Sequence, residues 1–443
     1  MATMSNESSD PTSTAKPPSS SSSSLLPTAS SPEAQNPRKS ILRTRHDQPR
    51  PFIALSLSLS QRIPPEVIDL VIENVSPIDI KTLGACALVS KAWLAAGRHR
   101  LFLTVTLNES NAGRFMDLLD APYLTIANSV HEIFLVAASN RPIPSDLVEY
   151  YPPRRAPHHE EIARRLSAFP SLTSLCVSWV LESTGSFTAA VTHSSLSLTE
   201  LEFRVCKLKS FSQFTRVLAG LQSLRRLIIS DVEWYDGHSL AQVSTYQRIP
   251  ARLQTLELYT PTILPFCSWL SFHAKSFLEL DTLRLCSLFW DAQDASSIGQ
   301  LLKCFGPKIK HLSLPWHFPE IDLSYSKGLR SLHFTHLRFQ TDFIGLQTAA
   351  ISSDVVERTL YQLTSPILET IDFTAETFLL DYETIGRILT KPCFSQLKVI
   401  RTGVASCDRN LHNLLKRIHG SGKVPPLKLR RRSAFSTLTD RRG

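Results

Sequence analysis

The chain is poor in glycine, with 15 among 443 residues, and it lacks the short motifs of the common enzyme classes. GxxxxGK[ST], GxGxxG, GxSxG and HExxH do not occur in it. A phosphate-binding loop needs glycines where the backbone approaches the ligand, and a hydrolase needs a positioned nucleophile or metal. We therefore expect a protein that is not an enzyme, with no catalytic residues and no cofactor.

The eight cysteines include no CxxC pair, which counts against a disulfide framework or a zinc site. Cys176, Cys206 and Cys286 lie within apolar segments, where a thiol behaves as a small buried hydrophobe. The cluster His158-His159-Glu160-Glu161 could suggest a metal site. Neighbouring side chains point in different directions and no second cluster completes a site. We expect no bound metal.

Long hydrophobic runs are also missing. No apolar stretch approaches the ~18 residues of a membrane span. The Ser/Thr/Pro-rich first residues lack the apolar core of a signal peptide. These absences predict an intracellular protein, cytoplasmic or nuclear, with no membrane partner.

The formal charge of +9 is unevenly distributed. Residues 1–62 hold seven Lys/Arg against four Asp/Glu, and residues 416–443 hold nine against one, which leaves the remainder at −2. We expect the basic tail, 416–443, to be solvated. Its run Lys428-Leu429-Arg430-Arg431-Arg432 could also be read as a nuclear import signal. A near-neutral body makes nucleic acid an unlikely partner.

The chain divides by composition into five segments. Residues 1–50 include an unbroken Ser run, Ser19 to Ser24, and predict a disordered Ser/Pro-rich tail that is dispensable for folding. Residues 60–103 have helical periodicity, residues 104–171 form a connecting region, and residues 172–415 repeat. Within the connecting region, Val130-Ile133-Leu135 resembles a first, diverged repeat.

The helical segment shows start signals for three helices. Pro64 and Pro65 suit a first helical turn, and apolar residues follow at helical spacing. Ser76 before Pro77 predicts the cap of a second helix, and Ser90 predicts the cap of a third helix.

The repeating segment carries the pattern apolar-x-x-apolar-x-apolar, with first positions 20 to 39 residues apart. Helices are expected between the strands, for example over Ser210 to Leu221 and Ser296 to Phe305. The units are Leu172-Leu175-Val177, Leu198-Leu201-Phe203, Leu224-Leu227-Ile229, Leu253-Leu256-Leu258, Leu280-Leu283-Leu285, Ile309-Leu312-Leu314, Leu329-Leu332-Phe334, Leu368-Ile371-Phe373 and Phe394-Leu397-Val399.

This motif and period resemble the leucine-rich repeat, although the family's usual asparagine is absent. One unit cannot bury its own apolar face, so units stack. The resemblance implies an α/β fold in which 172–415 forms a curved, irregular solenoid.

The segment Ile63-Pro64-Pro65-Glu66, followed by Leu88-Val89-Ser90 and Trp93, resembles an F-box. An F-box docks a protein onto the Skp adaptor and, through it, a cullin. The resemblance implies that the adaptor-binding residues are Ile63, Pro64, Pro65, Ile68, Leu88, Val89 and Trp93. The sequence does not divide these between adaptor contact and the core of the module.

Side chains alternate along a strand, so the residue between the last two apolar positions of each unit points away from the core. We predict that this row binds the target protein and that, being exposed, it tolerates substitution. The row is Glu202, Ile228, Glu257, Arg284, Ser313, His333 and Asp372.

Together these features predict the non-catalytic, target-recognition subunit of a Skp-cullin-F-box ubiquitin ligase. The identity of the target is not predicted. Alternatives left open are a repeat scaffold unconnected to ubiquitin, an enzyme within an irregular repeat, and a nucleic-acid-binding solenoid.

Overall fold

The computed structural model describes the chain in segments, and both the predicted disordered tail, 1–50, and most of the basic tail lie outside them. The described residues are 63–76, 79–121, 126–136, 158–178, 197–234, 249–286, 292–315, 321–335, 353–373, 382–402 and 428–431.

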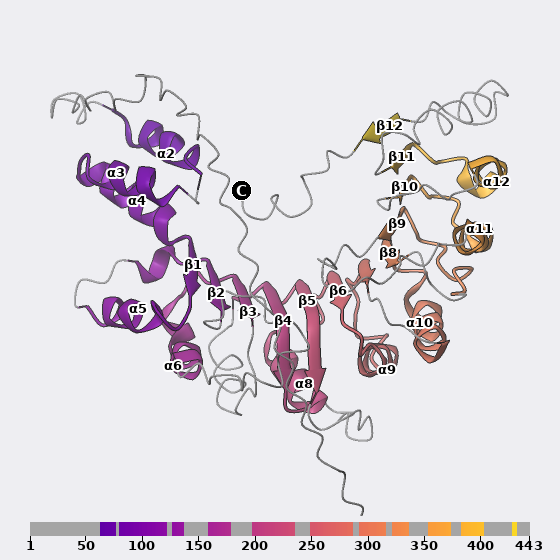
Figure 1. Cartoon of the computed structure of the whole chain (residues 1–443), viewed down its shortest axis with the longest axis horizontal. Coiled ribbons are helices and arrows are strands. Elements are labelled where there is room, and N and C mark those ends of the chain that lie inside the picture. Colours follow the sequence, from indigo (N-terminus) through magenta and orange to yellow (C-terminus); the bar gives the residue numbers. More distant parts are fainter. Residues whose placement is uncertain are drawn as a thin grey trace, which may run out of the picture. The chain divides into compact units, whose positions relative to one another are not determined.

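A single parallel sheet runs through most of the described chain, and its strands pair in sequence order from β1 to β12 (Figure 1). Parallel neighbours need a crossover between them, and helices lie in several of these connections. The strands are β1 Thr104–Leu107, β2 Glu132–Val136, β3 Ser174–Ser178, β4 Glu200–Leu208, β5 Arg226–Trp234, β6 Thr255–Tyr259, β7 Thr282–Leu285, β8 His311–Pro315, β9 Ser331–Thr335, β10 Thr370–Phe373, β11 Val399–Thr402 and β12 Lys428–Arg431.

Helices fall into an N-terminal group and a group between the strands. The N-terminal group is α2 Pro65–Glu73, α3 Ile80–Ala87 and α4 Lys91–Phe102. Between the strands lie α5 Ala112–Leu119, α6 His158–Arg165, α8 Phe211–Gly220, α9 Leu264–Phe272, α10 Ala292–Phe305, α11 Ser353–Gln362 and α12 Tyr382–Leu389, with short 3₁₀ turns η1 Ala127–Ser129, η3 Leu166–Ala168 and η6 Pro392–Phe394. The predicted α/β class is confirmed.

The apolar pattern of the sequence becomes aligned columns of buried side chains. The middle positions of the units form one column through β3 to β11, and each member is at most 1% exposed. That column is Leu175, Leu201, Leu227, Leu256, Leu283, Leu312, Leu332, Ile371 and Ile400. Fully burying one such side chain stabilises the fold by about 1.5–3 kcal/mol, so the column supplies a large share of the apolar free energy.

A repeated backbone bond joins successive units where each strand begins. The carbonyl of Thr173 accepts hydrogen bonds from the N–H groups of Thr199 and Glu200, at 2.8 and 2.9 Å. The same pair of hydrogen bonds, from two successive N–H groups to one carbonyl, recurs at the carbonyls of Thr199, Arg225, Gln254, Asp281, Lys310, Arg330 and Glu369. Each unit therefore fixes the register of the next.

The ninth unit begins three residues later than predicted, at Leu397 instead of Phe394. Ile400 pairs with Ile371, and Leu397 precedes it as Leu368 precedes Ile371, so the apolar positions are Leu397 and Ile400. Val399, predicted as a core position, pairs instead with Thr370 and is half-buried. Because side chains alternate with a period of two, an error of an odd number of residues moves a side chain to the other face.

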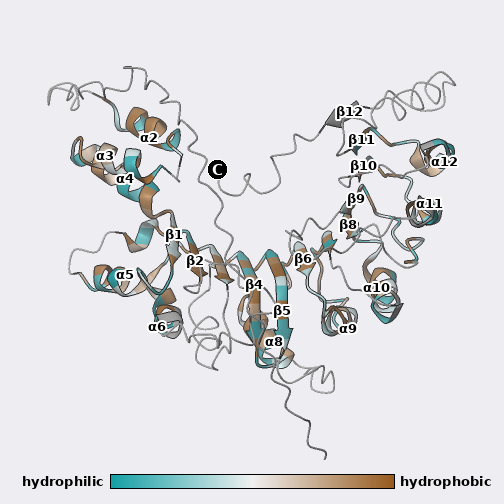
Figure 2. Ribbon diagram, viewed as in Figure 1, coloured by the Kyte–Doolittle hydropathy of each residue, from teal (hydrophilic) through white to brown (hydrophobic). Residues whose placement is uncertain are grey.

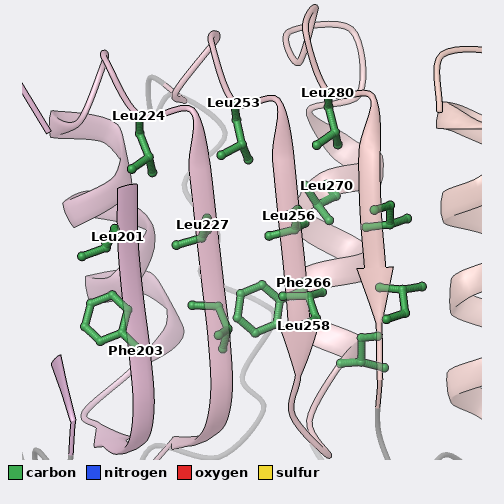
Figure 3. Packing of buried hydrophobic residues seen from close by; sticks show 14 of the residues in the cluster. Leu201, Phe203, Leu224, Leu227, Leu253, Leu256, Leu258, Phe266, Leu270 and Leu280 are labelled. Carbon is green, nitrogen blue, oxygen red and sulfur yellow. The ribbon is translucent and has the colours of Figure 1, made fainter. Parts of the chain in front are cut away.

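Helices α8 to α12 lie on one side of the sheet, and their apolar side chains join the strand columns in one core (Figure 1). Figure 3 shows Phe266 and Leu270 of α9 beside Leu256 and Leu258 of β6. Figure 2 shows brown, apolar residues along the strands, as this core requires. The strand face turned away from these helices is called the second face below.

Aromatic rings reinforce the core between α8, α9 and β5. Phe211 meets Phe266 at 5.1 Å and Trp234 at 5.2 Å between ring centroids, both nearly perpendicular. Phe214 meets Trp234 at 5.5 Å. Edge-to-face pairs of this kind add about 0.5–1.5 kcal/mol beyond area burial. The predicted helix over 210–221 is confirmed as α8, and Ser210 caps it by accepting from the N–H of Gln213.

Two aligned residues in β4 and β5 have left-handed backbones. Val205 has φ 49° and Asp231 has φ 50°, and they lie between register pairs that match on both sides. A β-branched residue such as Val205 is strained at positive φ. One residue on each strand lies between the matched pairs, so the register of β4 and β5 is kept. Beyond these two residues both strands continue, to Leu208 and Trp234, and they are longer than the other strands of the sheet.

The N-terminal helices pack around their own small core of Ile68, Ile72, Leu83 and Trp93. Gly97 allows α4 to approach α3 closely, because a Cβ there would lie 3.1 Å from the Cβ of Ala87. Ser90 caps α4 as predicted, since its hydroxyl accepts from the N–H of Trp93. The predicted Ser76 cap is wrong: α3 begins at Ile80, and Asp79 caps it by accepting from the N–H of Thr82 at 3.0 Å.

The sheet extends beyond the predicted repeat range of 172–415 at both ends. It begins at β1 and includes β2, where the diverged repeat was predicted. In the basic tail, residues 428–431 form β12 beside β11. Leu429 pairs in register with the buried Ile400, between Lys428 and Arg430, so the run alternates as a strand does. In the described part of the chain, none of the helices is long and apolar enough to cross a membrane.

Candidate functional site

The residues predicted to bind the adaptor separate into core and surface. Ile68 is 1% exposed and Trp93 is 8% exposed, so both hold the helices together. Leu88 is 86% exposed and Val89 is 42% exposed. Pro64 and Pro65 are exposed, and Ile63 is half-buried against the small core. Ile68 and Trp93 therefore position the helices, while the others are available for contact.

Four further apolar side chains are exposed on the same helices. Val67, Leu70 and Val71 of α2 are 45%, 59% and 42% exposed, and Ile80 of α3 is 67% exposed. Residues three and four apart share one face of a helix, so the three α2 residues form one stripe. Exposed large apolar side chains gathered on one small module are typical of a protein-binding surface. These residues with Pro64, Pro65, Leu88 and Val89 are called the apolar surface below.

The seven residues predicted to bind the target are brought together in one row of the second face. Strand register aligns Glu202, Ile228, Glu257, Arg284, Ser313, His333 and Asp372 in that order. Phe134 and Cys176 continue the row at one end and Arg401 continues it at the other.

Glu257 is the centre of an ion-pair network, called the central network below. Its Oε1 accepts from Arg226 Nε at 3.0 Å and Nη2 at 2.6 Å. Its Oε2 accepts from the Tyr259 hydroxyl at 2.8 Å and lies 3.3 Å from Arg284 Nη1. Glu200 lies 3.2 Å from Arg226 Nη1. One buried carboxylate thus links three neighbouring strands.

The same burial changes the ionisation of the groups around Glu257. Desolvation and the negative charge of Glu257 raise the pKa of the Tyr259 hydroxyl, so it stays protonated and donates. Burial is the largest influence on the pKa of Arg284 and would lower it, but the charges and hydrogen bonds of Glu257 and Tyr259 together outweigh burial and raise the pKa. Burial raises the pKa of Glu200, with partial opposition from Arg226.

The expectation that this row is exposed is wrong for five of its seven residues, since only Arg284 is exposed and His333 is half-buried. Glu257 is 2% exposed, and Ile228, Ser313 and Asp372 are 2–4% exposed. Closely spaced parallel strands shield each side chain with its neighbours on adjacent strands, about 4.8 Å away. Charge reversal at Glu257 would oppose two arginines and would destabilise the fold before it changed binding.

Ser313, His333 and Asp372 lie on adjacent strands and together have the composition of a hydrolase triad. The Ser313 hydroxyl lies 3.3 Å from His333 Nδ1, and His333 Nε2 lies 4.0 Å from Asp372 Oδ1. The second distance is too long for a direct hydrogen bond. Ser313 is 3% exposed, so its hydroxyl does not present to a substrate carbonyl. The geometry supports a polar contact between strands rather than nucleophilic catalysis.

One member of the predicted His/Glu cluster, Glu161 of α6, forms ion pairs within its own helix. Glu161 pairs with Arg164 at 2.8 Å and with Arg165 at 2.9 Å. No group of three or more His, Cys, Asp or Glu side chains within the described ranges could hold a metal ion.

Sequence reasoning missed the partners that complete the central network. Arg226 and Tyr259 lie two residues before Ile228 and two after Glu257, so the period of two places them on the same face. The alternation that identified the middle row could have identified them, because each strand contributes more than one residue to a face.

Comparison with known proteins does not assign the chain to a family. No protein-family model matches its sequence. No curated protein matches it significantly.

Proposed function

We propose that the protein is the non-catalytic, target-recognition subunit of a Skp-cullin-F-box ubiquitin ligase. Helices α2 to α4 would act as an F-box that docks the Skp adaptor. The sheet and its helices would act as a leucine-rich-repeat solenoid that binds the target. Catalysis would take place on other subunits, with this chain holding the target near them.

The exposure of the apolar surface carries the proposal. Leu88 at 86%, Ile80 at 67% and Leu70 at 59% would each leave water on docking a partner helix. Burial of one such aliphatic side chain contributes about 1.5–3 kcal/mol, and a few anchors suffice for a stable complex. Packing an apolar helix face against a partner needs no catalytic or metal-binding group.

The repeat assignment is supported by the regularity of the units. One buried column and one recurring pair of backbone hydrogen bonds join β3 to β11. Stacking such units exposes a long row of alternate side chains, which suits recognition of another protein.

Co-purification of the full chain with the Skp adaptor tests the proposal. Leu88→Asp places a charge in the apolar surface and should abolish adaptor binding. The matched control is Leu278→Asp, because Leu278 is also an exposed leucine, at 71%, but lies between α9 and β7. Ile63→Ala combined with Pro64→Ala should weaken binding without unfolding the sheet.

Retention of adaptor binding by Leu88→Asp, at the level of Leu278→Asp, would contradict the F-box assignment. A wild-type chain that never captures the adaptor would instead favour a repeat scaffold unconnected to ubiquitin.

A further inference from the structure

Large apolar side chains are exposed on one part of the repeat region. In the described segments that follow α5, every exposed side chain of this kind lies in a stretch of chain that leads into β7, β9 or β10. The stretches that lead into β7 to β11, residues 272–279, 303–308, 322–327, 361–367 and 391–394, are called the entry rim below. Apolar side chains gathered in this way are typical of a surface that binds another protein. They are Phe272 at 61% exposure, Leu278 at 71%, Tyr361 at 58%, Tyr325 and Ile367.

The stretches of the entry rim contact one another in sequence order. In each case a side chain of one stretch reaches the neighbouring stretch, so the exposed apolar residues belong to one continuous surface. The contacts are Lys308 Nζ to the Phe277 carbonyl at 3.3 Å, Lys303 Nζ to the Tyr325 ring centroid at 5.7 Å, Thr364 Oγ1 to the Ser324 carbonyl at 2.9 Å and Lys391 Nζ to the Tyr361 ring centroid at 3.5 Å.

The entry rim carries more lysines than carboxylates. It holds five lysines against Glu279 and Asp322. In the described segments, no carboxylate lies within ion-pair distance of any of the five. The carbonyls and ring faces that three of them contact offer only partial charges, so an excess of positive charge remains beside the apolar residues. The lysines are Lys275, Lys303, Lys308 and Lys327, which are exposed, and Lys391, which is half-buried.

Helix α2 has the opposite charge beside an apolar stripe. Residues 63–80 contain no lysine or arginine. Glu66, Asp69 and Glu73 are exposed, and their spacing of three and four residues places them on one face of α2. Glu66 and Asp69 each directly precede a residue of the apolar stripe of α2, about 100° away around the helix. The outer surface of α2 is therefore apolar on one side and acidic on the other.

We propose that α2 of one copy of the chain docks on the entry rim of a second copy. The apolar stripe of α2 would cover Phe272 and Leu278, and its carboxylates would meet the lysines beside them. The 9 residues of α2 rise about 1.5 Å each and span about 13 Å, and three strand spacings of about 4.8 Å span about 14 Å. The helix is thus long enough to lie along the rim from the stretch before β7 to the stretch before β10.

The contact joins two different surfaces, so it is heterologous and leaves one α2 and one entry rim free in each dimer. It does not depend on the proposed function. If both hold, a second copy and the Skp adaptor compete for α2, because the apolar stripe cannot be covered by both at once.

Sedimentation velocity of the purified full chain at increasing concentrations tests the inference, with no adaptor present. The wild-type mass should rise with concentration. Leu70→Asp in α2 and Leu278→Asp in the entry rim should each weaken self-association about tenfold or more, since each places a charge among the apolar anchors. The matched control is Leu118→Asp, at an exposed leucine of α5 outside both surfaces, which should change self-association less than about twofold.

A mixture of Leu70→Asp and Leu278→Asp chains gives the sharpest result. One variant keeps an intact entry rim and the other keeps an intact α2, so the mixture should form one-to-one dimers and nothing larger. Each variant alone should stay monomeric. Only a contact between two different surfaces gives this pattern.

Glu66→Lys/Asp69→Lys and Lys275→Glu/Lys327→Glu repeat the mixing experiment at exposed charged positions, should either leucine variant lose the thermal transition of the wild type. A wild-type chain that is monomeric at every concentration would overturn the proposal, as would a mixture that stays monomeric or equal weakening by Leu118→Asp. Adaptor capture by a chain that never self-associates would reject this inference and keep the proposed function. Self-association of a chain that never captures the adaptor would do the reverse.

Discussion

Replacement of Glu257 by glutamine should destabilise the sheet strongly, although the side chain keeps its size. Glu257 is 2% exposed and accepts from Arg226, Tyr259 and Arg284. Removing one partner of a fully buried ion pair costs about 3–5 kcal/mol, because the other charge stays buried. Arg226 and Arg284 are 27% and 44% exposed, so water compensates part of that cost. We expect a loss of about 2–4 kcal/mol.

Glu369→Gln is the matched control. It removes the same charge from an ion pair with Lys398 at 2.9 Å, in which the side chains are 40% and 60% exposed. Exposed pairs contribute about 0–1 kcal/mol and are screened by salt. Urea unfolding followed by circular dichroism should show a large decrease in the free energy of unfolding for Glu257→Gln, and this decrease should persist in high salt. For Glu369→Gln the decrease should be small and should disappear in high salt.

Tyr259→Phe provides a second measurement on the same carboxylate. Its hydroxyl donates to Oε2 at 2.8 Å, and a hydrogen bond to a charged group is worth about 1.5–3 kcal/mol. The two substitutions affect one network, so the double variant should lose less free energy of unfolding than the sum of the losses in the two single variants. Equal stability of Glu257→Gln and Glu369→Gln, or strict additivity with Tyr259→Phe, would refute the reasoning.

Three further outcomes are expected. Iodoacetamide at mildly alkaline pH should leave Cys176, Cys267 and Cys286 unmodified until urea is added, because burial raises the pKa of each thiol, that of Cys286 to about 11. Modification of these thiols before urea is added, detected by mass spectrometry, would contradict their burial. Gly328→Ala should lower the thermal midpoint, because a Cβ there would collide with the Pro307 carbonyl, whereas Gly299→Ala, at an open helical position of α10, should raise stability by about 0.5–1 kcal/mol. Calorimetry that shows a change of the same sign for both variants would contradict this packing. Asp79→Ala should lower helix content, because the N–H and hydroxyl of Thr82 donate to that carboxylate and lower its pKa. The contribution of the cap is present above the ordinary pKa of an aspartate and is lost as pH falls through the lowered pKa, so a far-ultraviolet signal that is insensitive to both the substitution and the pH would argue against the cap.

The strand positions could be predicted from the sequence because the period of two is a local property. Leu201 and Phe203, or Leu256 and Leu258, fall on one face whatever surrounds them. The ninth unit shows the limit of this reasoning. Near Leu397 several apolar residues allow two registers, and only pairing with β10 selects Ile400.

The helix caps show the same division. Ser90 was predicted because a capping residue acts on amides of its own turn. At the preceding helix both Ser76 and Asp79 satisfy the local rule. The structure starts α3 at Ile80 and uses Asp79, whose two carboxylate oxygens accept from the N–H and the hydroxyl of Thr82.

By itself the sequence determined the α/β class, the alternation that aligns Glu202 to Asp372 in one row, and the apolar content of the N-terminal helices. Tertiary structure decided which of these side chains are buried. Glu257 is enclosed by residues of neighbouring strands that are far from it in sequence, Arg226 and Arg284, while Leu88 remains in water although its residue type favours the core. Burial depends on what the rest of the chain places beside a residue, and no local pattern contains that information.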